Sequence, residues 1–149
     1  MSDVLDLDGL DALALAVDER IRALPPGCDP ARLFGVRTRP RGIVLVPFWS
    51  GVAREIPQWL APPSGITAVA LETGGWAAPM EPDGTVSARP SRHPHRQRIH
   101  QTIIIGGIRV DVSVLRYDDL AGDPIVLRNG AGAVLELLLA VWDRRPDRP

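Results

Sequence analysis

The chain has 149 residues, a net charge of −1 and a hydrophobic fraction of 45%. This length predicts one domain with a core of its own, and the near-neutral charge argues against a strong overall field for nucleic acid. All 17 basic residues are arginine. A lysine Schiff base, a lysine general base and the lysine of a phosphate-binding P-loop are therefore excluded.

The single cysteine, Cys28, cannot form an intrachain disulfide. This favours a reducing, cytoplasmic location. The first residues, M-S-D-V-L-D-L-D, are acidic and lack the basic region of a signal peptide. No apolar run approaches the ~18–20 residues that span a bilayer, so we expect no membrane segment.

The first elements follow from the apolar pattern. Apolar residues recur at helical spacing over residues 8–24 and predict an amphipathic helix that Pro25-Pro26-Gly27 would end. Residues 25–41 carry no clear period and are expected to form a loop. Residues 42–48 are almost entirely apolar and predict a short strand.

The middle of the chain alternates between weak elements and turns. Ser50 is placed to cap a helix reaching about residue 60, although Pro57 limits its regularity. Residues 66–73 predict a second strand. Residues 74–94 contain four prolines and little periodicity, which predicts a long loop. A loop of this length in a compact domain is often functional or mobile.

A β-hairpin is predicted next, with strands of about 97–105 and 108–117 around a two-residue Gly106-Gly107 turn. That turn would pair Ile105 with Ile108 and would place the isoleucines and valines on one face, with Gln101 as its polar exception. A shift of the register by one residue would exchange the faces.

The last part of the chain predicts a short strand, a turn and a helix. Residues 124–128 form the strand, Asn129-Gly130 the turn, and residues 134–142 a helix that is apolar nearly all round. Such a helix is buried within the fold or against another subunit. Gly130 and Gly132 indicate a turn and a helix start, because a dinucleotide site needs a longer glycine pattern.

Together these elements predict an α+β fold: an N-terminal amphipathic helix, a small, mainly antiparallel sheet with a central Gly-Gly hairpin, and a C-terminal apolar helix. We expect a single domain over residues 1–143. Residues 144–149, rich in arginine and proline, are expected to form a disordered tail.

The three histidines form one candidate site. His93, His95 and His100 could supply three nitrogens to zinc or manganese, with Asp83 or Asp111 adding an oxygen. A metal-dependent hydrolase would follow from such a site. Against it, Arg89, Arg92, Arg96 and Arg98 crowd the same segment and would repel a dication.

A serine nucleophile is a second possibility. In the predicted register His100 lies opposite Ser113 and diagonal to Asp111, which brings together a base, a nucleophile and an acid. A flat sheet face offers neither a strained nucleophile turn nor an oxyanion site. Cross-strand hydrogen bonding is therefore the ordinary account of these three residues.

Phosphate or nucleic-acid binding is a third possibility, because arginine forks match phosphate oxygens. The candidate residues share the 72–109 region and are Trp76, Arg89, Arg92, Arg96, Arg98 and Arg109. Few aromatic residues are available for base stacking. Pairing with the six acids of residues 1–19, or with an acidic protein partner, is an equal alternative.

Residues 72–98 resemble a pattern in uncharacterised bacterial and phage proteins, in which a strand ending in E-x-W precedes P-S-x-H-P-x-R. Here Glu72 and Trp76 match the first part, with two residues inserted, and residues 90–96 match the second. The resemblance implies no activity. It implies that Trp76, His93, Pro94 and Arg96 lock the loop, with the arginine pairing with Glu72.

These observations favour a non-catalytic intracellular protein that works through protein contacts, as a homo-oligomer or a phage or mobile-element accessory. The apolar C-terminal helix, the uneven charge and the tryptophans carry this hypothesis; the tryptophans are Trp49, Trp59, Trp76 and Trp142. The alternatives are the metal-dependent hydrolase and the phosphate- or nucleic-acid-binding protein.

Overall fold

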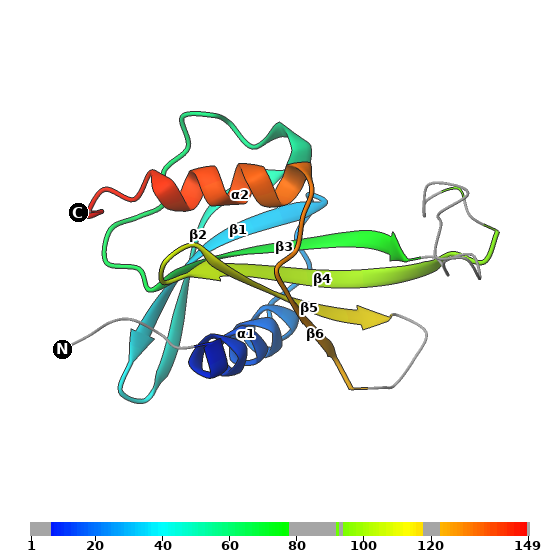
Figure 1. Ribbon diagram of the computed structural model, residues 1–149, viewed down its shortest axis with the longest axis horizontal. Coiled ribbons are helices and arrows are strands. Elements are labelled where there is room, and N and C mark those ends of the chain that lie inside the picture. The colour runs from blue at the N-terminus through cyan, green and yellow to red at the C-terminus, as the bar shows by residue number, and fades with distance from the viewer. Residues whose placement is uncertain (1–6, 78–91, 93, 118–122, 149) are drawn as a thin grey trace.

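The computed structural model describes residues 7–77, 92, 94–117 and 123–148. In chain order these residues form α1 (Leu7–Arg22), β1 (Ala31–Arg39), β2 (Gly42–Gly51), the 3-10 helix η1 (Ala53–Glu55), β3 (Ala68–Ala77), β4 (Gln97–Gly106), β5 (Val110–Tyr117), β6 (Ile125–Arg128) and α2 (Ala133–Asp143). The strands of this described part form one antiparallel sheet in the order β2-β1-β3-β4-β5-β6 (Figure 1). The predicted α+β class is confirmed.

The two helices cover opposite faces of the sheet, so the molecule has three layers (Figure 1). Side chains alternate along a strand. In β1, β3, β4 and β5 the even-numbered residues face α1 and the odd-numbered residues face α2. We call these two sides the α1 face and the α2 face.

Each face holds its own half of the core. On the α1 face the buried residues are Leu10, Leu13, Ala14, Val17, Ile21, Phe34, Val36, Ala68, Ala70, Ile104, Val112 and Val114. On the α2 face they are Ala31, Leu33, Ile56, Leu60, Val69, Leu71, Ile103, Ile105, Leu135, Leu138, Val141 and Trp142. The N-terminal helix and the buried C-terminal helix are thus confirmed, with ends within two residues of those predicted.

Two predicted segments are wrong. Residues 31–39 form β1, which lies between β2 and β3, whereas a loop was expected over residues 25–41. A strand covered on both faces does not alternate, so the period that reveals strands is missing. The helix expected from Ser50 is also absent among the described residues, because β2 continues to Gly51 and only η1 follows.

The predicted hairpin register is also wrong. The turn contains Gly107, Ile108 and Arg109 rather than two glycines, and Gly106 pairs with Val110. Gly107 and Arg109 have φ angles of 55° and 54°, and a left-handed last residue is typical of three-residue hairpin loops. The pairing is displaced by an odd number of residues, so β5 presents the opposite side chains to each face.

β3 and β4 extend together beyond their neighbours. β1 pairs with β3 only as far as Thr73, and β5 pairs with β4 only as far as Ile99, whereas β3 and β4 remain paired to Ala77 and Gln97. Residues 74–77 and 94–98, which we call the arm, therefore project from the body (Figure 1). Residues 74–77 are strand rather than the loop expected, and residues 78–91 and 93 lie outside the described residues.

The segment after α2 lies against the 57–65 segment. Arg144 donates from Nε to the carbonyl oxygen of Leu60 at 2.5 Å, and the amide of Gly65 donates to Asp147 at 3.2 Å. These contacts fall in the expected tail, residues 144–149, which is described as far as Arg148. None of the helices in the described ranges has the length and apolar character needed to span a membrane.

Candidate functional site

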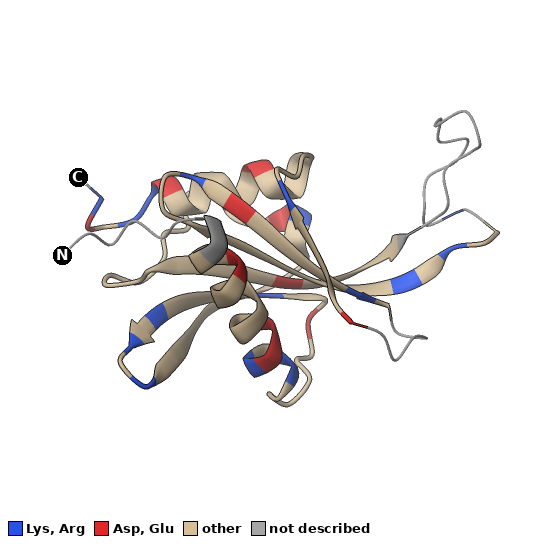
Figure 2. Ribbon diagram, turned by 60° about the horizontal axis from the view of Figure 1, so that its bottom comes forward, with Lys and Arg blue, Asp and Glu red and all other residues tan. Residues whose placement is uncertain are grey.

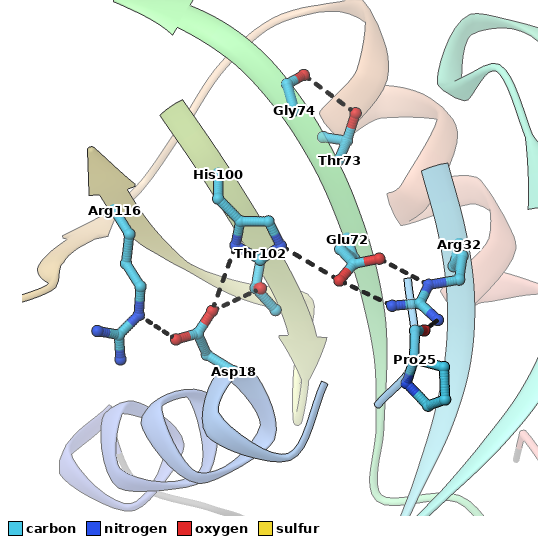
Figure 3. Close-up of polar contacts among 9 residues, drawn as sticks. All are labelled: Asp18, Pro25, Arg32, Glu72, Thr73, Gly74, His100, Thr102 and Arg116. Atoms are coloured by element: carbon cyan, nitrogen blue, oxygen red, sulfur yellow. Dashed lines mark hydrogen bonds and ion pairs between the residues drawn. The ribbon is translucent and has the colours of Figure 1, made fainter. Parts of the chain in front are cut away.

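The α1 face becomes polar toward the arm. Side chains from α1, β1, β3, β4 and β5 meet there in one continuous network (Figure 3). Its members are Asp18, Arg32, Glu72, His100, Thr102 and Arg116. Strand pairing sets their spacing, because Glu72 lies opposite Arg32 on one side and Thr102 on the other, and His100 lies opposite Arg116.

Glu72 is the centre of one half of this network. Arg32 binds both of its oxygens, with Nε 2.6 Å from Oε1 and Nη2 3.0 Å from Oε2. His100 Nε2 lies 3.2 Å from Oε2. Burial acts to raise the pKa of Glu72, but the hydrogen bonds and charges of His100 and Arg32 outweigh it and lower that pKa to about 2.

Asp18 is the centre of the other half and is fully buried. It accepts a hydrogen bond of 2.9 Å from Thr102 and one of 2.6 Å from Arg116 Nε. His100 Nδ1 lies 3.8 Å from Asp18 Oδ1, too far for a hydrogen bond, and this buried nitrogen has no hydrogen-bond partner among the described residues. The hydrogen bonds from Thr102 and Arg116 compensate the buried carboxylate of Asp18 and connect α1 to the sheet.

One of the three candidate metal ligands, His100, belongs to this network. His100 is held between Glu72 and Asp18, and His95 is exposed in the turn before β4. His93 lies outside the described residues. Within the described ranges no three His, Cys, Asp or Glu side chains are grouped so that they could hold a metal ion.

The serine, histidine and aspartate of the nucleophile hypothesis do not meet. Ser113 pairs with Ile103, and Asp111 pairs with Ile105, so both lie on the α2 face. His100 lies on the α1 face. The sheet separates the base from the nucleophile, and this candidate site is excluded.

Trp76 lies on the arm with two of the candidate arginines. Arg98 is directly opposite Trp76 in the β3–β4 register. The guanidinium of Arg98 lies 5.6 Å and that of Arg96 5.0 Å from the centre of the indole ring, within cation–π range. The ring remains 39% exposed. The contact expected between Trp76 and Arg96 is present.

The other candidate arginines are not part of this cluster. Arg109 lies at the opposite end of β4, in the hairpin turn, where its Nε is 3.3 Å from Asp143 Oδ1. Arg92 is exposed, and Arg89 lies outside the described residues. The expected pairing of Arg96 with Glu72 is wrong, because the hydrogen bonds of Glu72 come from Arg32 and His100.

The acids of the N-terminal helix pair with arginines outside residues 89–109. Asp11 accepts hydrogen bonds from Arg128 of β6, and Asp18 accepts one from Arg116 of β5. Pairing of the N-terminal acids with the arginines of residues 89–109 was one of the alternatives, but Asp11 and Asp18 pair with Arg128 and Arg116 instead.

A groove of about 590 Å³ opens on the α2 face, at the N-terminus of α2. Its polar lining comes from Arg54, Thr73, Gln101 and Ser113, and its glycine lining from Gly74, Gly130 and Gly132. The sequence carried two signals for it: the polar Gln101 on an apolar strand face, and the Gly130-Ala131-Gly132 entry to the helix. Arg54 gave no signal, because a regular helix was expected there.

Comparisons with protein families, with curated proteins and with solved structures find no match for this chain. The resemblance of residues 72–98 to the bacterial and phage group therefore stays a prediction. Arguments about function rest on the arm, the network and the groove.

Proposed function

We propose that the protein is a non-catalytic binding protein that holds an acidic segment of a partner protein on its arm. The observation that carries this proposal is Trp76, whose indole ring has the guanidinium groups of both Arg96 and Arg98 within cation–π distance. Tryptophan and arginine are the residues most enriched among those that dominate binding energy in protein interfaces.

The charge of the arm favours an acidic partner. Its described residues, 74–77 and 94–98, include Arg96 and Arg98 but no acid (Figure 2). Farther along the same face, Arg32 and Arg116 are paired with Glu72 and Asp18. Arg96 and Arg98 therefore bring two guanidinium groups to the surroundings of Trp76. Guanidinium forks match carboxylate oxygens in geometry and charge, which favours an acidic partner there.

The backbone of the arm supports a strand-like partner. Beyond Thr73, β3 has β4 on one side and no strand among the described residues on the other. An extended peptide can pair with such an edge, and alternate side chains would then reach the face that carries Trp76. An acidic extended segment satisfies both the edge and the charge. Self-assembly of the chain stays a prediction.

The proposal can be tested by selecting short random peptides on the immobilised full chain. The selected peptides should be rich in Asp and Glu, and their binding should weaken with salt, because exposed charges are screened. Trp76→Ala and Arg98→Gln should each weaken binding about tenfold, measured by fluorescence anisotropy with a labelled peptide. Trp59→Ala and Arg41→Gln are matched controls, because both side chains are exposed outside the arm.

Selected peptides without acidic residues, or equal binding by the Trp76→Ala chain, would contradict the proposal. A labelled single-stranded oligonucleotide is measured in parallel. If it binds more tightly than the peptides, with a steep loss of affinity in salt, the arm is a nucleic-acid site instead.

A further inference from the structure

We infer that the groove at the N-terminus of α2 binds a ligand in which a carboxylate is attached to an apolar group. This site lies on the α2 face, whereas Trp76 and the arginines of the arm lie on the α1 face. The inference is therefore independent of the partner proposed for the arm.

The helix supplies the first donors. The N-cap of α2 is Gly132, which has a φ angle of 119° and no side chain to cap the helix. The first hydrogen bond within the helix runs from Glu136 N to Gly132 O at 3.1 Å. The amides of Ala133, Val134 and Leu135, which line the groove, precede that bond and have no partner among the described residues. Such amides, at the positive end of a helix dipole, bind anions.

Ser113 is the second, independent indication of a ligand. Its side chain lines the groove from β5 and the residue is only 8% exposed. Within the described part of the chain its hydroxyl has no hydrogen-bond partner. Because Ser113 lines the groove, its hydroxyl is placed to form a hydrogen bond with a ligand atom there.

Two further polar side chains border the same space. Gln101 lines the groove from β4, on a face where its neighbours Ile103 and Ile105 are apolar. Arg54 lines it from η1 and is exposed. Neither side chain forms an ion pair or a hydrogen bond with another described residue. Together they offer one positive charge and an amide that can donate or accept.

The surrounding charges decide which anion fits. Asp111 lies beside the groove, where its Oδ2 accepts a 2.8 Å hydrogen bond from Gly130 N, and Glu55 and Glu136 are exposed nearby in η1 and in the first turn of α2. These carboxylates would repel a phosphate dianion more strongly than a single negative charge. A carboxylate needs only the one arginine and the neutral donors.

The apolar residues of the groove indicate which chemical group the carboxylate is attached to. Its apolar members are Pro30, Val52, Ala53, Ile103, Val134 and Leu135. A volume of about 590 Å³ lies within the range of sites that enclose small organic ligands. A short aliphatic acid and the C-terminal residue of a peptide share this chemistry, a carboxylate next to an apolar group.

The test uses the full chain labelled with ¹⁵N and two pairs of probes. Hexanoate is compared with hexanamide, and the peptide Ala-Ala-Leu is compared with its C-terminal amide. At millimolar concentration, at least one carboxylate should shift the amide signals of Gly132, Ala133 and Val134, and its neutral counterpart should not. Hexanoate alone would identify a small acid as the ligand, and the peptide alone would identify a chain end.

Three variants then test the named groups. Ala133→Pro removes one helix amide, and proline is well tolerated at the first helical position. Arg54→Gln removes the charge, and Ser113→Ala removes the hydroxyl. Each should raise the dissociation constant of the bound carboxylate about three- to tenfold. Arg41→Gln, on the β1–β2 turn, should leave it unchanged.

Several results would overturn the inference. The first is the absence of amide shifts at the start of α2 with either carboxylate. Others are equal binding of a carboxylate and its amide, and binding of inorganic phosphate in preference to both acids. Because Arg54 is exposed, its variant reports on binding even if Ala133→Pro disturbs the helix.

Discussion

Glu72 and His100 illustrate what single residues contribute to this fold. Glu72 forms hydrogen bonds with both Arg32 and His100. His100 also lies beside the buried Asp18. Arg32 of β1 pairs with Glu72 of β3, and Arg116 of β5 pairs with Asp18 of α1, with His100 between the two carboxylates. The network therefore compensates the buried carboxylate of Asp18 and the half-buried carboxylate of Glu72, and its contribution to stability depends on the ionisation of Glu72.

The stability of the protein should fall in acid because of Glu72. The pKa of this side chain is about 2 in the folded state and 4.5 as a reference value, so between these values the unfolded chain binds more protons. Stability is then fully present above about pH 5 and is lost as the pH falls toward about 2. The loss should be of the order of 1–2 kcal/mol, because solvent partly screens the group.

Urea unfolding of the wild type and of Glu72→Gln, measured across this pH range, checks this prediction. The variant should be less stable at neutral pH, and its stability should depend less on pH below 5. Glu55→Gln is the matched control, because Glu55 is exposed on η1. An unchanged acid profile in Glu72→Gln would show that other groups control the acid response.

The hairpin between β4 and β5 shows how one turn decides the placement of a whole element. Arg109 ends this turn with a φ angle of 54°, a conformation that costs a residue with a side chain about 1–2 kcal/mol. The turn length sets the register. That register brings Arg116 to Asp18 and places Ser113 on the α2 face, where it lines the groove.

Arg109→Gly should stabilise the protein, because glycine adopts positive φ without a steric cost. We expect a net gain of about 0.5 kcal/mol, since glycine also makes the unfolded chain more flexible. Arg109→Ala keeps the strained φ and loses the exposed ion pair with Asp143, so it should be neutral or slightly destabilising. Thermal unfolding of both variants distinguishes the two effects; a glycine variant no more stable than the alanine variant would contradict the strain argument.

The whole molecule depends on the sheet being covered on both sides. α1 and α2 share no face, and each buries a separate half of the core against the same strands. A sheet with one face exposed to water would present Leu71, Ile103 and Ile105, all of which are buried beneath α2 or beside it. The two halves should therefore unfold together.

A chain that ends at Gly132 should fail to fold, because it lacks the side chains of Leu138, Val141 and Trp142 in the α2 face core. A chain that ends at Asp143 keeps α2 and should give a single cooperative transition. Circular dichroism and one-dimensional NMR of both truncations check this. A folded chain without α2 would show that the α1 face alone can sustain the sheet.

The sequence by itself determined the elements that have a visible period or a breaker. These include both helices, the β4 and β5 segments, β6 and the α+β class, because amphipathic spacing is a local property of the chain. β1 was hidden for the opposite reason: a strand covered on both faces has no alternation. At the candidate sites, only the proximity of Trp76 and Arg96 was anticipated.

Only the tertiary structure decided the rest. The register of β5 depends on the backbone of a three-residue turn, and it separates His100 from Ser113 while bringing His100 to Asp18 and Glu72. The groove forms where α2 begins over the sheet, from residues far apart along the chain. Such contacts depend on how elements pack and pair, which the local period of a sequence does not specify.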